Sequence, residues 1–79
     1  LPRTSRQQWN AGPKVALKDL RAGDLLFWAY DTSDPTTIHH VALYVGGGRM
    51  VEAPRTGLDV REIPVYLNGY IGAIRPTRA

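Results

Sequence analysis

The sequence predicts an α+β domain, in which a short N-terminal helix precedes a curled antiparallel sheet of about five strands. Two observations support this prediction. Residues 1–12 combine helix-start signals with a tryptophan, and Gly12-Pro13 ends the segment. The rest of the chain consists of short runs rich in β-branched and aromatic residues, separated at close intervals by Gly, Pro, Asn and Asp. Such closely spaced strands predict an antiparallel meander that curls into a small barrel-like sheet.

The size and composition of the chain limit what it can be. Its 79 residues suffice for at most one small domain, and a hydrophobic fraction of 43% is ordinary for a globular protein. The net charge of +3 would suit a polyanionic surface, but the excess is small and spread along the chain. No apolar run is long enough to span a membrane, so we expect no transmembrane segment. The sequence contains no cysteine, and it predicts no cofactor and no metal site.

The helix is predicted within residues 1–12, where Thr4 followed by Gln7 fits a capping box and Trp9 is the expected packing anchor. A chain that opens on Leu-Pro without a starting methionine looks like a piece of a longer protein. Residues 14–23 are interpreted as a connector. The run LLFWAY at residues 25–30 is the most apolar of the chain and predicts a central strand.

Later turns define the remaining strands. Residues 31–37 hold Ser, Asp, Pro and Thr, which predicts an exposed loop. Residues 38–52, IHHVALYVGGGRMVE, then predict a strand, a glycine turn and a second strand. Two more strands are expected, around residues 60–63 and at residues 70–74. The hairpin is a candidate functional site because its first strand carries both histidines of the chain and its second strand carries a carboxylate.

The register of this hairpin decides whether its polar residues meet. If the three glycines 46–48 form the loop, Val45 faces Arg49, and His40 lies diagonally across from Glu52 on the same face. Their side chains are then within reach of each other. A two-residue loop would place His40 and Glu52 on opposite faces. Their pairing is therefore a hypothesis about the length of the loop.

Each of these residues also has an ordinary interpretation. From spacing alone, His40 is by default a strand histidine and Glu52 a solvated charge, and only a shared face raises both. Tyr44 lies on the face of His40 and is interpreted as core, with substrate binding at the site as the alternative. His39 points to the other face, where a solvated or packing role is expected. Two histidines alone do not make a metal site, because adjacent strand residues diverge.

The remaining polar residues are interpreted as structural or solvated. Asp24 follows Gly23 and is expected to be a turn residue. Ser5 is interpreted as a helix cap and Ser33 as part of a flexible loop, so neither is a good nucleophile candidate. The arginines are interpreted as mostly solvated surface, with some available to anionic ligands: Arg3, Arg6, Arg21, Arg49, Arg55, Arg61, Arg75 and Arg78.

Four segments, in this order and spacing, resemble the NlpC family of cell-wall cysteine peptidases: LPRTSRQQ, RAGDLLFW, HHVALYVGGGRMVEAP and YIGAIRP. The family has a reduced papain-like fold, and the resemblance covers nearly the whole chain. It implies that residues 1–79 are the C-terminal portion of a single peptidase domain. In the family, a helix with an Asp-Cys-Ser-Gly motif lies just upstream of the Leu-Pro-Arg-Thr-Ser segment, and these 79 residues do not include it.

The resemblance implies an activity. Family members hydrolyse the bond between D-γ-glutamyl and diaminopimelate (or lysine) in peptidoglycan stem peptides, which implies a secreted or cell-wall-associated protein. His40 corresponds to the general base of a Cys-His-Glu triad and Glu52 to its orienting residue, with the cysteine supplied by the missing N-terminal half. Many members have histidine where this chain has Glu52. A carboxylate there remains chemically suitable, because it accepts a hydrogen bond from the imidazole and fixes its tautomer.

Two other function classes stay open on the sequence. One is a non-catalytic relative that binds stem peptides or the wall in the same groove. The other is a small basic β-barrel that binds nucleic acid, which predicts aromatic residues interleaved with arginines. The aromatic residues lie instead in apolar strand runs, so we expect no nucleic-acid partner. We also expect the isolated chain to be unstable, to oligomerise or to stay associated with its missing half.

Overall fold

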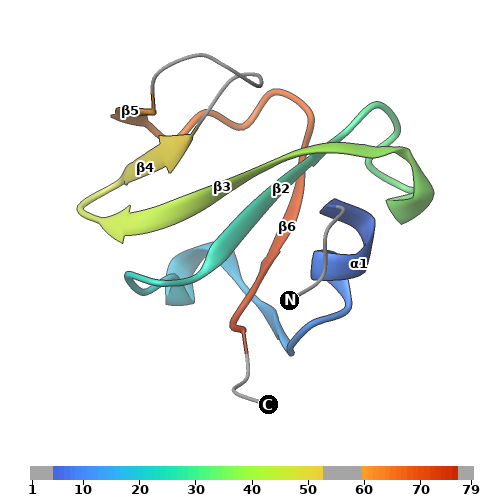
Figure 1. Cartoon of the computed structure of the whole chain (residues 1–79), viewed down its shortest axis with the longest axis horizontal. Helices are drawn as coiled ribbons and strands as arrows, with labels where there is room; N and C mark the ends of the chain where they lie inside the picture. Colours follow the sequence, from blue (N-terminus) through green and yellow to red (C-terminus); the bar gives the residue numbers. More distant parts are fainter. Residues whose placement is uncertain (1–4, 53–59, 77–79) are drawn as a thin grey trace.

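The computed structural model describes residues 5–52 and 60–76, and in them one short helix precedes a six-stranded antiparallel sheet (Figure 1). The helix has five residues, and two short 3₁₀ turns lie in the connections. The elements in chain order are α1 (Ser5–Trp9), β1 (Lys14–Val15), η1 (Leu17–Asp19), β2 (Leu25–Ala29), η2 (Pro35–Thr37), β3 (Ile38–Gly46), β4 (Arg49–Glu52), β5 (Arg61–Pro64) and β6 (Tyr70–Ile74).

The sheet has the strand order β1-β6-β2-β3-β4-β5, with every pairing antiparallel. The predicted fold class is therefore confirmed, but the predicted meander holds only from β2 to β5, because β6 pairs with β1 and β2 and not with β5. The prediction missed one strand, β1, which lies in the segment interpreted as a connector and pairs with the end of β6. Two residues are too few for an alternation pattern, so only the pairing with Ile74 and Ala73 makes Lys14 and Val15 a strand.

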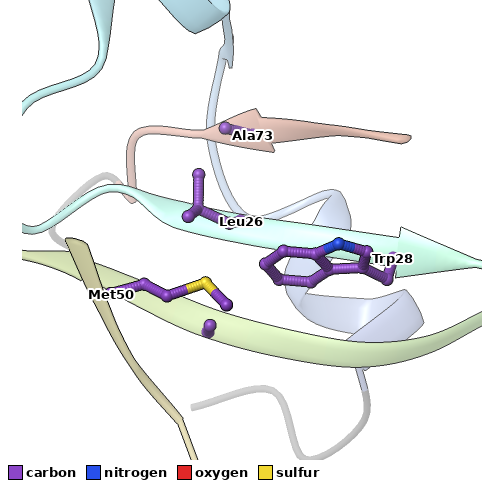
Figure 2. Close-up of a cluster of buried hydrophobic side chains, with 5 residues drawn as sticks. Leu26, Trp28, Met50 and Ala73 are labelled. Carbon is purple, nitrogen blue, oxygen red and sulfur yellow. The ribbon is translucent and has the colours of Figure 1, made fainter. Parts of the chain in front are cut away.

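The central strand β2 is buried on both faces, which explains its continuous apolar sequence. One face carries an inner cluster of buried residues, four of which are labelled in Figure 2: Leu26, Trp28, Ala42, Met50 and Ala73. Val15 from one edge strand and Ile63 from the other both pack against this same cluster. Residues from opposite edges can share one cluster only if the sheet curls around it, as predicted.

The helix covers part of the opposite face of the sheet (Figure 1). There Trp9 packs edge-on against Phe27, with ring centroids 5.2 Å apart, so Trp9 is the anchor that the sequence predicts. Gly72 on β6 makes room for this indole, because a Cβ atom at Gly72 would lie 2.9 Å from Cη2 of Trp9. The glycine in the middle of a strand therefore marks a close approach between helix and sheet.

The β3–β4 hairpin corrects the predicted loop. Gly46 pairs with Arg49, so the loop contains two glycines rather than three, and Val45 does not face Arg49. The register shifts between Tyr44 and Gly46, which makes Val45 the extra residue of a β-bulge. This bulge restores the register beyond it, where Leu43 pairs with Val51. The shared face of His40 and Glu52 is thus obtained through a bulge and not through the length of the loop.

Candidate active site

The site is centred on a contact between the imidazole of His40 and the carboxylate of Glu52. Nε2 of His40, on β3, lies 2.7 Å from Oε1 of Glu52, on β4. The Glu52 side chain is 1% exposed, whereas that of His40 is 18% exposed. A buried carboxylate against a partly accessible imidazole is an arrangement in which the first can orient the second.

The other oxygen of Glu52 is bound by Arg61, one of the arginines interpreted above as mostly solvated surface. Arg61 is the cross-strand partner of Glu52 on β5. Its Nε and Nη2 atoms both donate to Oε2, at 2.9 and 2.6 Å. Arg61 is exposed, as expected of most arginines in this sequence, but it also binds a buried carboxylate, a contact that the sequence did not indicate. Only the pairing of β4 with β5 reveals its role, and the sequence between these strands gives no spacing rule for that pairing.

Glu52 is ionised at neutral pH. Burial alone would raise the pKa of its carboxyl group, but the hydrogen bonds and charges of Arg61 and His40 outweigh it and hold the pKa below its usual value. An ionised carboxylate only accepts hydrogen bonds, so Nε2 of His40 carries the proton in this contact. Within residues 5–52 and 60–76, Nδ1 of His40 has no hydrogen-bond partner. A neutral His40 in this tautomer can accept a proton at Nδ1.

One aromatic residue, Trp28, packs beside the imidazole of His40, and a second, Tyr66, packs against Trp28. The Trp28 ring lies 5.3 Å from that of His40 at an interplanar angle of 44° and 4.9 Å from that of Tyr66. The indole N–H of Trp28 donates to the backbone carbonyl of Tyr66 at 3.2 Å. Burial and the nearby negative charge of Glu52 raise the pKa of Tyr66, so its phenol stays protonated at neutral pH. Trp28 thus belongs to the buried core and also contacts the site.

These side chains line one hollow of the surface, of about 250 Å³: His39, His40, Glu52, Arg61 and Tyr66. His39 is the extra residue of a second bulge, because Trp28 pairs with His40 while Ala29 pairs with Ile38. Its imidazole is exposed and stacks on the ring of Tyr30, with centroids 4.0 Å apart. His39 therefore lies at the rim of the same hollow as His40 and not on the other face, while its exposure and stacking agree with the expected solvated or packing role.

Tyr44 lies elsewhere, although it shares the inner face with His40. Its hydroxyl accepts a hydrogen bond from the amide of Gly48 at 3.0 Å, in the turn of the hairpin. It lines a separate hollow with Leu17, Leu20 and Val65. The structure therefore brings His40 and Glu52 together and leaves Tyr44 apart from them. Substrate contact by Tyr44 stays a prediction.

Asp24 is more than the turn residue expected from the sequence. It is 2% exposed and accepts hydrogen bonds from the backbone N–H of Arg21 and from the guanidinium of Arg75. Arg75 is likewise partly exposed, with a side chain 41% accessible, and its ion pair with Asp24 is a contact that the sequence did not indicate. In the described part of the chain, no cluster of three or more His, Cys, Asp and Glu could hold a metal ion. No helix within it is long and apolar enough to cross a membrane.

Residues 1–74 match the NlpC/P60 family. The chain belongs to the NlpC/P60 family. This confirms the family that the four sequence segments indicate. The described elements that carry the site, β3, β4 and β5, all lie inside the matched range.

Two relatives of this NlpC/P60 chain are enzymes of known name. It is 50% identical over 60 residues to the gamma-D-glutamyl-L-lysine dipeptidyl-peptidase of Bacillus subtilis strain 168. It is 42% identical over 65 residues to the peptidoglycan endopeptidase RipA of Mycolicibacterium smegmatis. These matches cover 76% and 82% of this chain but only 20% and 12% of the two relatives. The chain therefore spans a fifth or less of each of these proteins.

Two solved structures have the same fold over nearly the whole chain. An NlpC/P60 family protein from Bacillus cereus matches with a TM-score of 0.81 at 39% identity, over 96% of this chain and 26% of the other. RipD from Mycobacterium tuberculosis matches with a TM-score of 0.76 at 38% identity, over 95% of this chain and 53% of the other. RipD is described as a non-catalytic NlpC/P60 domain protein adapted to peptidoglycan binding.

Proposed function

We propose that this chain is the C-terminal portion of a single cysteine peptidase domain that hydrolyses peptidoglycan. The bond cleaved is the one between D-γ-glutamyl and diaminopimelate (or lysine) in stem peptides. His40 is the general base, Glu52 orients it, and a cysteine in the segment before Leu1 is the nucleophile. The observation that carries the proposal is the 2.7 Å contact between Nε2 of His40 and Oε1 of buried Glu52, which leaves Nδ1 available.

The reaction proceeds in two halves. In the first, the cysteine sulfur, its proton transferred to Nδ1 of His40, attacks the carbonyl carbon of the γ-glutamyl amide. The tetrahedral intermediate collapses by breaking the C–N bond, the leaving amine takes the proton from Nδ1, and a thioester remains. In the second half, water gives a proton to Nδ1 and adds to the thioester carbonyl. The C–S bond then breaks, which releases the acid and restores the thiol.

Glu52 acts on His40 without touching the substrate. Its ionised carboxylate keeps the proton on Nε2, so the lone pair of neutral His40 is on Nδ1. The same charge stabilises the imidazolium that forms when Nδ1 takes the proton. Because Glu52 is buried, water screens this interaction little. The hollow bounded by His39, Arg61 and Tyr66 offers space for the stem peptide next to His40.

The activity of the relatives supports a target in the cell wall. A gamma-D-glutamyl-L-lysine dipeptidyl-peptidase and a peptidoglycan endopeptidase are both similar to this chain. A protein that acts on peptidoglycan works outside the cytoplasmic membrane, so we place this one among secreted or cell-wall-associated proteins. The proposal includes neither a cofactor nor a nucleic acid as partner.

The test uses the complete domain, expressed from the gene with the segment that precedes Leu1. Release of the dipeptide or tripeptide product from a D-γ-glutamyl-diaminopimelate substrate and its lysine counterpart is measured by mass spectrometry. His40→Ala is expected to lower kcat by about 10²–10⁴-fold, the usual contribution of a general base. Glu62→Gln, on the same edge strand but away from His40, is the matched control and is expected to leave kcat unchanged. Wild-type rates in His40→Ala would rule out the proposed role.

A second candidate function is binding of peptidoglycan without catalysis, and the similarity to RipD favours keeping it. It predicts that the complete protein has no cysteine at the expected upstream position and that it binds purified peptidoglycan without cleaving it. It also predicts that His40→Ala leaves binding largely unchanged. Reading the sequence before Leu1, by intact-mass and fragmentation measurements on the native product, separates the two candidates directly.

A further inference from the structure

Arg61 binds only one of the two carboxylate oxygens of Glu52. Both of its donating nitrogens, Nε and Nη2, bind Oε2, whereas Oε1 is left to Nε2 of His40. A fork that bound one nitrogen to each oxygen would compete with the imidazole for Oε1. The observed geometry instead sets the rotation of the carboxylate, because one oxygen is occupied twice and the other faces His40.

The contact of Arg61 with Glu52 matters because the Glu52 carboxylate is buried. With Arg61 in place the Glu52 side chain is 1% exposed, so Oε2 takes its hydrogen bonds from Arg61 and not from solvent. The Arg61 side chain is itself 56% exposed and does not belong to the inner cluster. Its substitution therefore removes two hydrogen bonds at the site without leaving a hole in the core.

We propose that Arg61 is a positioning residue for the reaction, because it holds Glu52 with Oε1 on His40 and thereby selects the tautomer with a free Nδ1. This inference rests on the proposed function. The other titratable groups around the imidazole are few in the described structure. Glu52 faces it from β4, Tyr66 lies beyond Trp28 in the segment after β5, and His39 precedes it on β3. Of these, only Glu52 makes a hydrogen bond to His40.

The same pair of strands offers a matched control. Arg49 on β4 donates to Glu62 on β5 at 2.8 Å, and both side chains are about half exposed. This ion pair joins β4 to β5 as Arg61 and Glu52 do, but it makes no contact with His40. If Arg61 only ties the edge strand to the sheet, neither Arg49→Gln nor Arg61→Gln should change the tautomer of His40 in the folded protein, whatever each costs in stability.

The experiment is carried out on the complete domain with two readouts. The first is kcat and KM for the stem-peptide substrate. The second is the tautomer of His40, read from its ring ¹⁵N shifts at alkaline pH. The spectra are recorded in a background in which the upstream cysteine is replaced by alanine, so that no thiolate affects the ring. A merely structural arginine would not change the tautomer of a folded variant.

In wild type the proton is expected on Nε2. In Arg61→Gln we expect a mixture of the two tautomers and a kcat lowered about tenfold, with KM within about twofold, as for the loss of other outer-shell partners of a histidine. Arg61→Lys keeps the charge but donates from one nitrogen, so it should fall between wild type and Arg61→Gln in both readouts. Arg49→Gln should match wild type in both.

Several results would overturn the inference. One is a wild-type tautomer together with a wild-type kcat in Arg61→Gln. Another is a large rise in KM at unchanged kcat, which would mean that Arg61 binds a substrate carboxylate. If Arg61→Gln does not fold, the test rests on Arg61→Lys. A wild-type kcat and a wild-type tautomer in Arg61→Lys would contradict the proposal that two nitrogens of Arg61 must bind Oε2. The proposed function is tested separately by His40→Ala and Glu52→Gln: if these lose activity while Arg61→Gln does not, only the role of Arg61 fails.

Discussion

The carboxylates of Asp24 and Glu52 are both buried and both bound by an arginine, but their remaining hydrogen-bond partners differ. Both are at most 3% exposed, and each is bound by an arginine whose side chain is roughly half exposed. At Asp24, Nε and Nη2 of Arg75 donate to the two oxygens separately, each at 3.0 Å. At Glu52, the arginine takes only one oxygen, and a histidine takes the other.

The hydrogen-bond partners of the two oxygens of Asp24 are a guanidinium and a backbone amide, neither of which takes up a proton. The backbone N–H of Arg21 adds a third hydrogen bond at 2.9 Å, and Arg75 also donates to the carbonyl of Asp19. These contacts join the turn before β2 to the end of β6, which are 51 residues apart in sequence. The hydrogen bonds of Arg75 chiefly hold the pKa of Asp24 below its usual value, against the effect of burial. Asp24 therefore serves as a fixed clamp between distant segments.

One of the hydrogen-bond partners of Glu52, His40, can itself take up a proton. His40 is 12 residues from Glu52 in the sequence and is partly exposed. The buried carboxylate of Glu52 is therefore in contact with an imidazole that solvent can reach. Burial of an ionised carboxylate therefore does not by itself mark an active site. What distinguishes the two sites is whether one oxygen of the carboxylate remains for a titratable, solvent-accessible partner.

The largest expected effect on stability comes from Asp24→Asn. The amide removes the negative charge and turns a donating NH₂ group toward the N–H groups of Arg75 or Arg21, so buried polar groups lose their partners. We expect the free energy of unfolding of the complete domain to fall by about 2 kcal/mol, the usual cost of leaving a buried donor without its acceptor. Urea unfolding measures it. The kcat of the folded fraction should stay at the wild-type value, and a large loss of kcat would contradict the division of roles.

Glu52→Gln should show the opposite pattern, with activity lost more than stability. Arg61 can bind only the amide oxygen, so the NH₂ group faces Nε2 of His40 and forces the proton onto Nδ1. We expect kcat to fall about a hundredfold or more, as when a triad carboxylate is replaced by its amide. The loss in unfolding free energy should be smaller than in Asp24→Asn. Steady-state kinetics and urea unfolding on the same samples test both parts.

Acid should weaken the fold through both carboxylates. The pKa values of Asp24 and Glu52 are lowered in the folded state, so each contributes stability above the pKa of an unfolded carboxyl, near pH 4. That contribution is lost as the pH falls through the lower folded value. We therefore expect the unfolding free energy to decrease with falling pH below about pH 4. The decrease should be shallower in Asp24→Asn, and equal slopes in urea titrations of both proteins would contradict this.

The smallest effect is expected at the exposed pair of Arg49 and Glu62. Both side chains are about half exposed, so water and salt screen their attraction. Arg49→Gln should change the free energy of unfolding by less than about 0.5 kcal/mol and leave kcat unaltered. Thermal and urea unfolding at low and high salt measure the change. A loss comparable to that of Asp24→Asn would show that strand pairing, and not burial, sets the energy of these ion pairs.

Much of the fold could be predicted from local patterns. The apolar run of β2, the glycine turn after β3 and the Asn-Gly before β6 each specify structure within a few neighbouring residues. The pair of His40 and Glu52 could be proposed because both belong to one hairpin, where the register follows from a short loop. The predicted reason was wrong in detail, since Val45 forms a bulge and the loop has two glycines. The shared face survived because bulge and loop together insert the same number of residues.

The amino-acid sequence by itself determined the family, the order of most strands and the two residues at the centre of the site. Only the tertiary structure decided which arginine binds which carboxylate, and it also made a strand of Lys14 and Val15. Arg61 and Arg75 look alike in the sequence, and each is separated from its carboxylate by residues that carry no register signal. Their roles depend on strand pairings set by burial of the inner cluster, a property of the whole sheet and not of any local segment.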